Sequence, residues 1–220
     1  MRIGLVSDIH ANKVAFDAVL DALPEDVDQL LCAGDVVGYN PWPAECVAMV
    51  RDREIPTVAG NHERMVLADR NFRGNGMAAA GVDHARAALD DAAMTWLASL
   101  PTDRRALDGR VRVVHGHPEN PDRYTYPDQF RPELLGEERV LVMGHTHVQH
   151  AEQYEEEIVV NPGSVGQPRD EDPRAAYAIL DLEEPSIDLR RVEYDIDAVA
   201  AAVEDADLPR RTADRLYQGR

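Results

Sequence analysis

The octapeptide LCAGDVVG, residues 31–38, sets a pattern that the rest of the chain repeats. An apolar run ends at a glycine, one aspartate follows, and a second glycine comes four residues after the first. A short apolar run bounded by glycines predicts a buried strand that ends in a tight turn. We expect this turn to present Asp35 at the carboxyl edge of a sheet, where open α/β folds bind their ligands.

The same arrangement, an apolar strand followed at once by polar side chains, occurs four more times. These strands are predicted over residues 2–7, 55–59, 111–114 and 140–143. Any one of the polar residues has an ordinary explanation in a turn, but that explanation needs five coincidences to cover all of them. The residues at the five strand ends are Asp8, His10, Asp35, Asn61, His62, His115, His117, His145 and His147.

Apolar spacing predicts helices between the strands. They are expected over residues 14–23, 43–53, 65–100, 198–203 and 210–217, and further strands over residues 158–160, 176–182 and 187–192. The three consecutive glutamates at 155–157 are expected to form a solvated hairpin turn. This alternation of helices and strands indicates an α/β protein.

Two loops and one acidic residue beside the strand ends are harder to assign from the sequence. The proline-rich loop over residues 118–132 could overhang a site, where Tyr124 and Tyr126 either contact a substrate or pack. The glycine-rich loop over residues 161–169 lacks the P-loop spacing, so we expect a structural turn beside the site. Glu63 is interpreted as an ordinary acidic residue in the first turn of a helix.

The length and the charge of the chain limit the classes of protein to which it can belong. The chain has 220 residues, enough for a substantial core, and shows no linker or repeat. Its 41 acidic and 23 basic residues give a net charge of −18, and Lys13 is the only lysine. Such a surface is typical of adaptation to high salt, although a GC-rich genome would produce part of it. The net field repels polyanions and argues against general binding of DNA or RNA.

The location of the protein is predicted from what the sequence lacks. Two cysteines, Cys32 and Cys46, are too few for a disulfide framework. No apolar run approaches the roughly 18 residues needed to cross a bilayer, and Met1 leads directly into a strand. We therefore expect no signal peptide and no membrane anchor, and a cytoplasmic location.

The polar residues at the strand ends are metal-ligand types. Carboxylate, amide oxygen and imidazole without thiolate suit manganese, iron, zinc, nickel or cobalt. Two ions about 3.5–4 Å apart, sharing a carboxylate, can hold the attacking and leaving oxygens of a phosphoryl displacement. The pattern therefore indicates a hydrolase with two metal ions, and Asp35 is the candidate for the shared ligand.

The motif series resembles that of the calcineurin-like metallophosphoesterases over roughly residues 1–170, in order and in spacing. The short single-domain archaeal and bacterial phosphodiesterases, with an NPGS loop such as residues 161–164, are the most similar branch. The resemblance implies one domain over residues 1–220, folded as a four-layer α/β/β/α sandwich with mixed sheets. The matching motifs are Asp8-x-His10, Gly34-Asp35-x-x-Gly38, Gly60-Asn61-His62-Glu63, His115 and Gly144-His145-x-His147.

The resemblance also implies roles for these residues. A water bridging the two ions would be the nucleophile, and His62 would be the general acid. Manganese is the metal expected first, and the substrate would be a small phosphate ester or nucleotide, cleaved by a phosphodiesterase or phosphatase. The implied ligands are Asp8, His10, Asp35 and His147 for the first ion and Asp35, Asn61, His115 and His145 for the second.

The chain departs from the serine/threonine protein phosphatases of this family at two positions. Gly38 and Tyr39 stand where those enzymes have an aspartate and a phosphate-binding arginine, which weakens that alternative. Arg169 and Arg123 are the candidates for the phosphate contact, and His117 either lines the pocket or is a polar turn residue.

Two further alternatives stay in view. A non-catalytic scaffold, similar to the retromer subunit of this fold, should have a damaged site, whereas this chain keeps every expected ligand. A nuclease similar to the DNA-repair exonucleases is disfavoured because the surface is acidic and no capping domain is present. The natural substrate, the metal and the formation of a homo-oligomer are left open.

Overall fold

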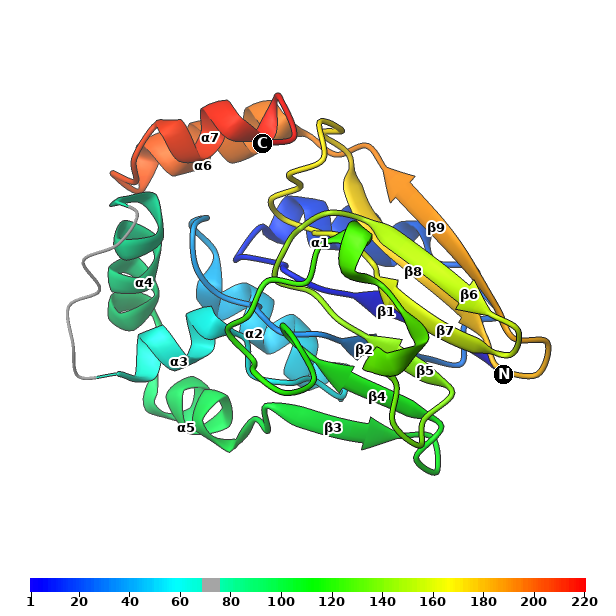
Figure 1. The fold of residues 1–220 in the computed structure, drawn as a ribbon. Coiled ribbons are helices and arrows are strands. Elements are labelled where there is room, and N and C mark those ends of the chain that lie inside the picture. Colours follow the sequence, from blue (N-terminus) through cyan, green and yellow to red (C-terminus); the bar gives the residue numbers. More distant parts are fainter. Residues whose placement is uncertain (69–75) are drawn as a thin grey trace.

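Nine strands form two mixed sheets that pack face to face in the computed structural model, which describes residues 1–68 and 76–220 (Figure 1). The strand order is β2-β1-β8-β9 in the first sheet and β3-β4-β5-β7-β6 in the second. The first sheet comprises β1 (Arg2–Val6), β2 (Gln29–Cys32), β8 (Ala175–Asp181) and β9 (Ser186–Val192). The second comprises β3 (Asp103–Ala106), β4 (Val111–Val114), β5 (Val140–Val142), β6 (His150–Tyr154) and β7 (Glu157–Asn161).

The layers follow from the alternation of side chains along each strand. In β5, Val140 and Val142 join the core between the sheets, while Leu141 faces the other way. In β1, Ile3 and Leu5 join the same inner core. The inner core therefore consists of residues contributed by both sheets at every second position.

The two outer faces of the sheets are covered unequally. Helices α1 (Lys13–Ala22) and α2 (Pro43–Asp52) pack on the first sheet. The second sheet has only a thin cover, to which Phe130, Leu134 and Leu135 contribute from the segment with the short 3-10 helices η1 (Pro127–Gln129) and η2 (Pro132–Leu134). The expected α/β fold with two mixed sheets is confirmed. Its fourth layer is thin, because the helices in it are the two short 3-10 helices η1 and η2.

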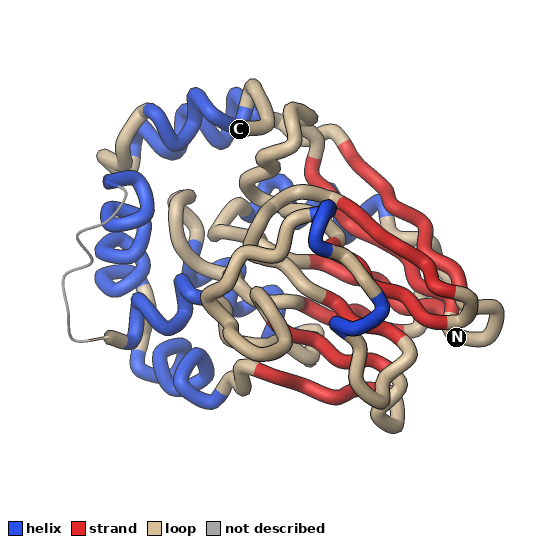
Figure 2. Tube along the Cα trace, viewed as in Figure 1, coloured by secondary structure: helices blue, strands red, loops and turns tan. Residues whose placement is uncertain are grey.

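The remaining helices lie to one side of the sheets, as Figure 2 shows in blue. They are α3 (Asn61–Leu67), α4 (Gly76–Ala88), α5 (Asp91–Ser99), α6 (Ile196–Asp205) and α7 (Arg211–Leu216). Part of the helical region expected over 65–100 lies outside the described residues. Asp90 separates α4 from α5, because its side chain accepts the Ala93 N–H at 2.7 Å and caps the new helix.

One expected strand is absent, and two observed strands were not expected. Residues 55–59 form no strand but an isolated bridge between Thr57 and Cys32, since Pro56 has no N–H to donate to a ladder. Strands β3 and β6 were not predicted by the apolar pattern. Both are edge strands with polar sequences, so they lack the hydrophobic alternation that identifies a half-buried strand.

The parallel pairs bring several strand ends to one edge of the molecule. Strand β1 pairs in parallel with β2, and β5 pairs in parallel with β4 and with β7. Parallel strands end at the same side, so the loops that follow them meet there. Within the described residues, no helix combines the length and the apolar character that a membrane span requires.

Candidate metal centre

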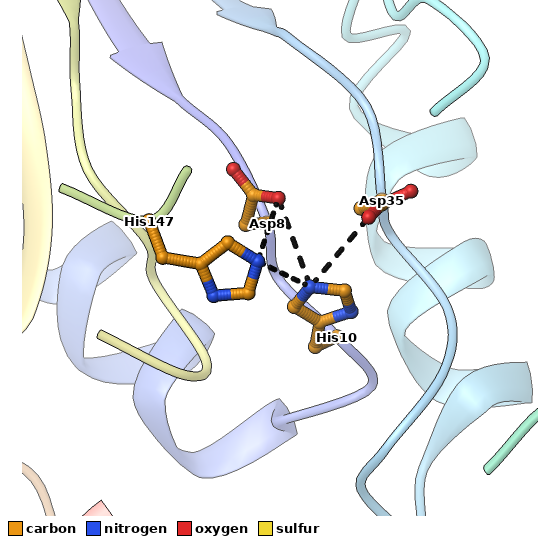
Figure 3. A group of neighbouring side chains, drawn as sticks. All are labelled: Asp8, His10, Asp35 and His147. Atoms are coloured by element: carbon orange, nitrogen blue, oxygen red, sulfur yellow. Dashed lines mark hydrogen bonds and ion pairs between the residues drawn. The ribbon is translucent and has the colours of Figure 1, made fainter. Parts of the chain in front are cut away.

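Two groups of ligand-type side chains meet at this edge, and Asp35 belongs to both. Within each group the potential ligand atoms all lie within 4.8 Å of one another. Figure 3 shows the first group, in which Asp8, His10 and His147 join Asp35. The second group joins His115 and His145 to Asp35, and the Asn61 Oδ1 lies 3.0 Å from the His115 Nε2. The structure therefore brings together all seven residues expected to bind metal.

Backbone carbonyls orient the four histidines of these groups. A carbonyl oxygen only accepts hydrogen bonds, so the ring nitrogen facing it carries the hydrogen. In a neutral imidazole the other nitrogen then presents a bare lone pair, which here points to the centre. The bonds run from His10 Nδ1 to Val37 O (3.1 Å), His115 Nδ1 to Ala33 O (2.8 Å), His145 Nε2 to Asp122 O (3.2 Å) and His147 Nδ1 to Gln167 O (2.5 Å).

The inward lone pairs face one another at short range. The His10 Nε2 lies 3.0 Å from the His147 Nε2, and the His115 Nε2 lies 3.1 Å from the His145 Nδ1. Two lone pairs cannot form a hydrogen bond with each other, whereas a cation between them satisfies both. The donor set therefore fits bound metal.

Asp8 gives an independent indication of a cation. Its Oδ2 accepts bonds from the Ser7 hydroxyl at 2.7 Å and from the His145 N–H at 3.0 Å. Its Oδ1 is buried, has no hydrogen-bond donor among the described residues, and lies 3.2 Å from the His147 Nε2. A buried acceptor without a donor costs free energy, and a metal ion at this position would remove that cost.

The pKa values within the cluster reflect its charge pairs. Burial alone would raise the pKa of Asp35, but His115, His62 and His10 outweigh it and hold the pKa well below its usual range. Burial would lower the pKa of His115, yet the Asp35 carboxylate, 3.3 Å from the His115 Nε2, raises it to about 9. Burial and the nearby His115 lower the pKa of His145 to about 4. These shifts show that the carboxylate and imidazole groups of the cluster interact strongly with one another.

His62 lies next to this cluster at the start of α3. Its backbone N–H donates to the Asp35 Oδ1 at 2.8 Å, and its ring packs against the rings of His10 and Tyr39 at centroid distances of 4.7 and 4.8 Å. A Cβ at Gly38 would lie 2.1 Å from the His62 Nδ1, so only glycine fits there. Burial lowers the pKa of His62 to about 4. Packing thus orients this ring, and within the described part of the chain its Nδ1 has no hydrogen-bond partner.

Glu63 has a larger role than the helix-dipole charge that the sequence suggests. It is fully buried and accepts backbone N–H bonds from Asp35 at 2.9 Å, Val37 at 3.1 Å and Gly60 at 2.7 Å. Burial and the charge of Asp35 raise the pKa of Glu63 to about 7. Its place three residues after Gly60 is the signal of a capping box, and here the same side chain also holds the Asp35 turn.

Most of the candidate ligands have a left-handed backbone. Asp8, His10, Asp35, His145 and His147 have φ values of 52°, 48°, 54°, 69° and 60°. Residues other than glycine rarely adopt this conformation, and they keep it only where the surroundings enforce it. The glycine-rich loop contributes, because the Ser164 hydroxyl donates to the Asp8 carbonyl at 2.7 Å. This loop is a structural turn beside the site, in agreement with the sequence-based expectation.

A cavity of about 250 Å³ opens beside the two ligand groups, and Tyr39, Tyr124, Arg169 and Arg215 form part of its wall. Tyr124 stacks on the ring of His145, with centroids 4.0 Å apart and planes at 18°. Arg215 lies far along the chain from every motif, and nothing in its local sequence indicates a site.

Three other residues that the sequence suggested for the pocket, Tyr126, Arg123 and His117, do not line this cavity. Tyr126 stacks on Tyr124 at 6.0 Å without lining the cavity. Arg123 is exposed beyond the lining residues. The His117 Nδ1 accepts the Glu119 N–H at 3.1 Å, which makes His117 a polar turn residue. Of the two arginines considered for phosphate binding, the structure therefore favours Arg169.

Comparison of the sequence with known proteins finds a family profile and relatives that match most of the chain. The profile of the calcineurin-like phosphoesterase superfamily domain matches residues 1–185. A protein of Methanocaldococcus jannaschii without assigned function is 30% identical over 99% of this chain and 98% of its own length. The phosphodiesterase YfcE of Escherichia coli is 29% identical, over 85% of this chain and 91% of its own.

Solved structures show the same fold. A metallophosphoesterase from Sphaerobacter thermophilus has a TM-score of 0.87 and 33% identity, with 100% of this chain and 99% of that chain covered. A hypothetical protein from Pyrococcus horikoshii has a TM-score of 0.88 at 20% identity, covering 100% and 98% of the two chains, which shows the fold alone. Vps29 from Chaetomium thermophilum also shares the fold, with a TM-score of 0.51 at 16% identity over 88% and 94%.

Proposed function

This chain belongs to the calcineurin-like phosphoesterase superfamily, and we propose that it hydrolyses small phosphate esters or nucleotides with the help of two metal ions. Family membership and the phosphodiesterase relative support a hydrolase of phosphate esters. One observation carries the two-ion proposal: two pairs of histidine nitrogens face each other, and each pair belongs to a ligand group that includes Asp35.

Each ion would have its own set of ligands. The Asp35 Oδ2 lies 3.6 Å from the His10 Nε2 and 3.3 Å from the His115 Nε2, which supports a carboxylate shared between the two positions. The donor set lacks thiolate, so we favour manganese, with iron, zinc, nickel or cobalt as alternatives. Asp8, His10, Asp35 and His147 would hold the first ion, and Asp35, Asn61, His115 and His145 the second.

When bound, the ions would supply an acidic water as nucleophile and neutralise charge on the phosphoryl oxygens. His62, which lines the cavity beside Asp35, would protonate the leaving oxygen. A phosphate arriving beside the imidazole favours its protonated form. Tyr124 would offer an apolar face to the organic part of the ester, because its ring lines the cavity and is about half exposed.

A non-catalytic scaffold on this fold receives less support. The similarity to Vps29 concerns the fold alone. All seven residues expected to bind metal are present and lie together, which a scaffold does not require.

Substitution of the shared carboxylate tests the proposed function. We expect the wild-type protein, stripped by chelator and reloaded with Mn²⁺, to hydrolyse bis-p-nitrophenyl phosphate or p-nitrophenyl phosphate. Asp35→Asn should lose at least about 10³-fold in kcat/KM and bind less manganese by calorimetry, because the shared negative charge is removed.

Asp90→Asn is the matched control. It makes the same chemical change at the N-cap of α5, where asparagine caps as well as aspartate. Equal activity or equal manganese binding in Asp35→Asn and the wild type would refute the proposal.

A further inference from the structure

Two arginines, Arg169 and Arg215, form part of the cavity wall. Arg169 donates from Nη2 to the Tyr39 hydroxyl at 3.2 Å and to the Gln167 Oε1 at 2.9 Å. Arg215 donates from Nε to the Arg220 carbonyl. Across residues 1–68 and 76–220, neither arginine pairs with an Asp or Glu carboxylate, and the partner of Arg215 is the main-chain oxygen of the last residue in the sequence. In a protein with a net charge of −18, a cavity whose wall includes two such guanidinium groups is suited to an anion.

Arg169 lies beside the ligand cluster, where its backbone N–H donates to the His147 carbonyl at 3.1 Å. The Tyr39 ring centroid is 4.8 Å from the ring centroids of both His10 and His62. Its hydroxyl contacts Arg169, whose Cζ is 5.8 Å from the same centroid. An anion held by these arginines would lie in the same cavity as the ligand cluster.

Arg215 reaches the cavity from a part of the chain that the family profile does not match. It belongs to α7, whereas the profile ends at residue 185. We call residues 196–220 the C-terminal arm. Its Leu216 packs with Val199 and Val203 of α6 and with Trp42 beside α2. In Figure 1 the arm, in orange and red, lies along the top of the molecule, with one end next to α4.

The end of the arm is attached to the loop that carries Arg169. The Glu171 N–H donates to the Gly219 carbonyl at 2.9 Å, and the Arg220 guanidinium pairs with the Glu171 carboxylate at 3.1 Å. A Cβ at Gly219 would lie 2.6 Å from the Asp172 backbone, so the two segments are in close contact. These contacts fix the position of Arg215 relative to Arg169.

We propose that Arg169 and Arg215 form a subsite for a second phosphate group, next to the one that is cleaved, and that the preferred substrates are oligophosphate esters. This inference rests on the proposed function, because the cleaved phosphate defines the neighbouring position. Guanidinium groups bind phosphate through paired N–H donors, and two of them suit a group with two or more charges. The arm is thus the element that selects the substrate.

Matched nucleotides with one and two phosphates test the subsite. Phosphate release from AMP and from ADP is measured with the manganese-loaded wild type, Arg215→Gln and Arg211→Gln. We expect the wild type to prefer ADP, and Arg215→Gln to reduce kcat/KM for ADP by about tenfold more than for AMP, as for a lost charge-assisted hydrogen bond. Arg211→Gln removes the same charge from the same helix at a residue outside the cavity wall, and should keep the preference.

Calorimetry with non-hydrolysable α,β-methylene ADP gives a readout that needs no turnover. Its affinity should fall about tenfold in Arg215→Gln and in Arg169→Gln, and Arg215→Lys should recover part of the loss. If the wild type hydrolysed no phosphate ester, the proposed function would fail, and this titration would still judge the subsite. Equal losses for AMP and ADP, unchanged binding of the analogue, or an equal effect of Arg211→Gln would overturn the inference. Thermal unfolding of each variant reports whether α7 remains docked.

Discussion

The ligand cluster and the C-terminal arm meet at the same cavity, but they are built on different principles. The cluster is buried, its histidines are oriented by backbone carbonyls, and most of its candidate ligands adopt left-handed turns after strands. The arm consists of two helices held by one apolar patch and a few surface contacts. Under the two proposals above, the chemistry would depend on the sheets, whereas the choice of substrate would depend on an attached element.

Loss of the proposed proton donor should have the largest effect, and it should be confined to the chemistry of the cluster. His62→Ala should reduce kcat by about 10³-fold for phenyl or alkyl esters, whose leaving oxygens need a proton. The loss for nitrophenyl esters should be much smaller, since nitrophenolate leaves without one. Rates across a series of leaving groups provide the measurement, and an equal loss for all of them would reject the role of His62.

Removal of Glu63 should show how far the stability of the cluster depends on one buried side chain. Glu63→Ala leaves three backbone N–H groups of the Asp35 and Gly60 turns without their acceptor, which should cost about 3 kcal/mol or more in the free energy of unfolding. Glu45, an exposed acidic residue in the first turn of α2, is the control, and its alanine variant should change stability by under about 0.5 kcal/mol. Urea unfolding measures both, and similar midpoints would contradict the interpretation.

A substitution inside the C-terminal arm should have a smaller effect, and the effect should be confined to the arm. Leu216→Ala removes a fully buried side chain from the arm and should cost about 2 kcal/mol. Because the arm is attached through its own apolar patch and a few contacts near Glu171, hydrogen exchange should quicken in α6 and α7 and stay slow in β1. Leu189→Ala, at a partly exposed position on β9, is the control. Equal loss of protection in β1 and α7 would mean that arm and sheets unfold as one unit.

The strand ends were predictable because their signals are local. An apolar run, a glycine and a polar residue lie within eight positions around Asp35, and the same order recurs at Asn61 and His145. Apolar runs also precede Asp8 and His115. Edge strands β3 and β6 were not predictable, since polar strands at the edge of a sheet show no apolar period. The strand expected at 55–59 failed for the opposite reason: its residues are apolar, but Pro56 interrupts the ladder.

Sequence alone was sufficient to identify the donor types, their order and the family that they resemble, because each motif is short and chemically distinctive. Convergence of these motifs on Asp35 depends on the order in which the strands pair, which no local pattern encodes. The burial of Glu63 and the arrival of Arg215, 180 residues after Asp35 in the chain, are consequences of packing between distant segments. Only the tertiary structure could reveal them, because a side chain acquires its surroundings when the chain folds.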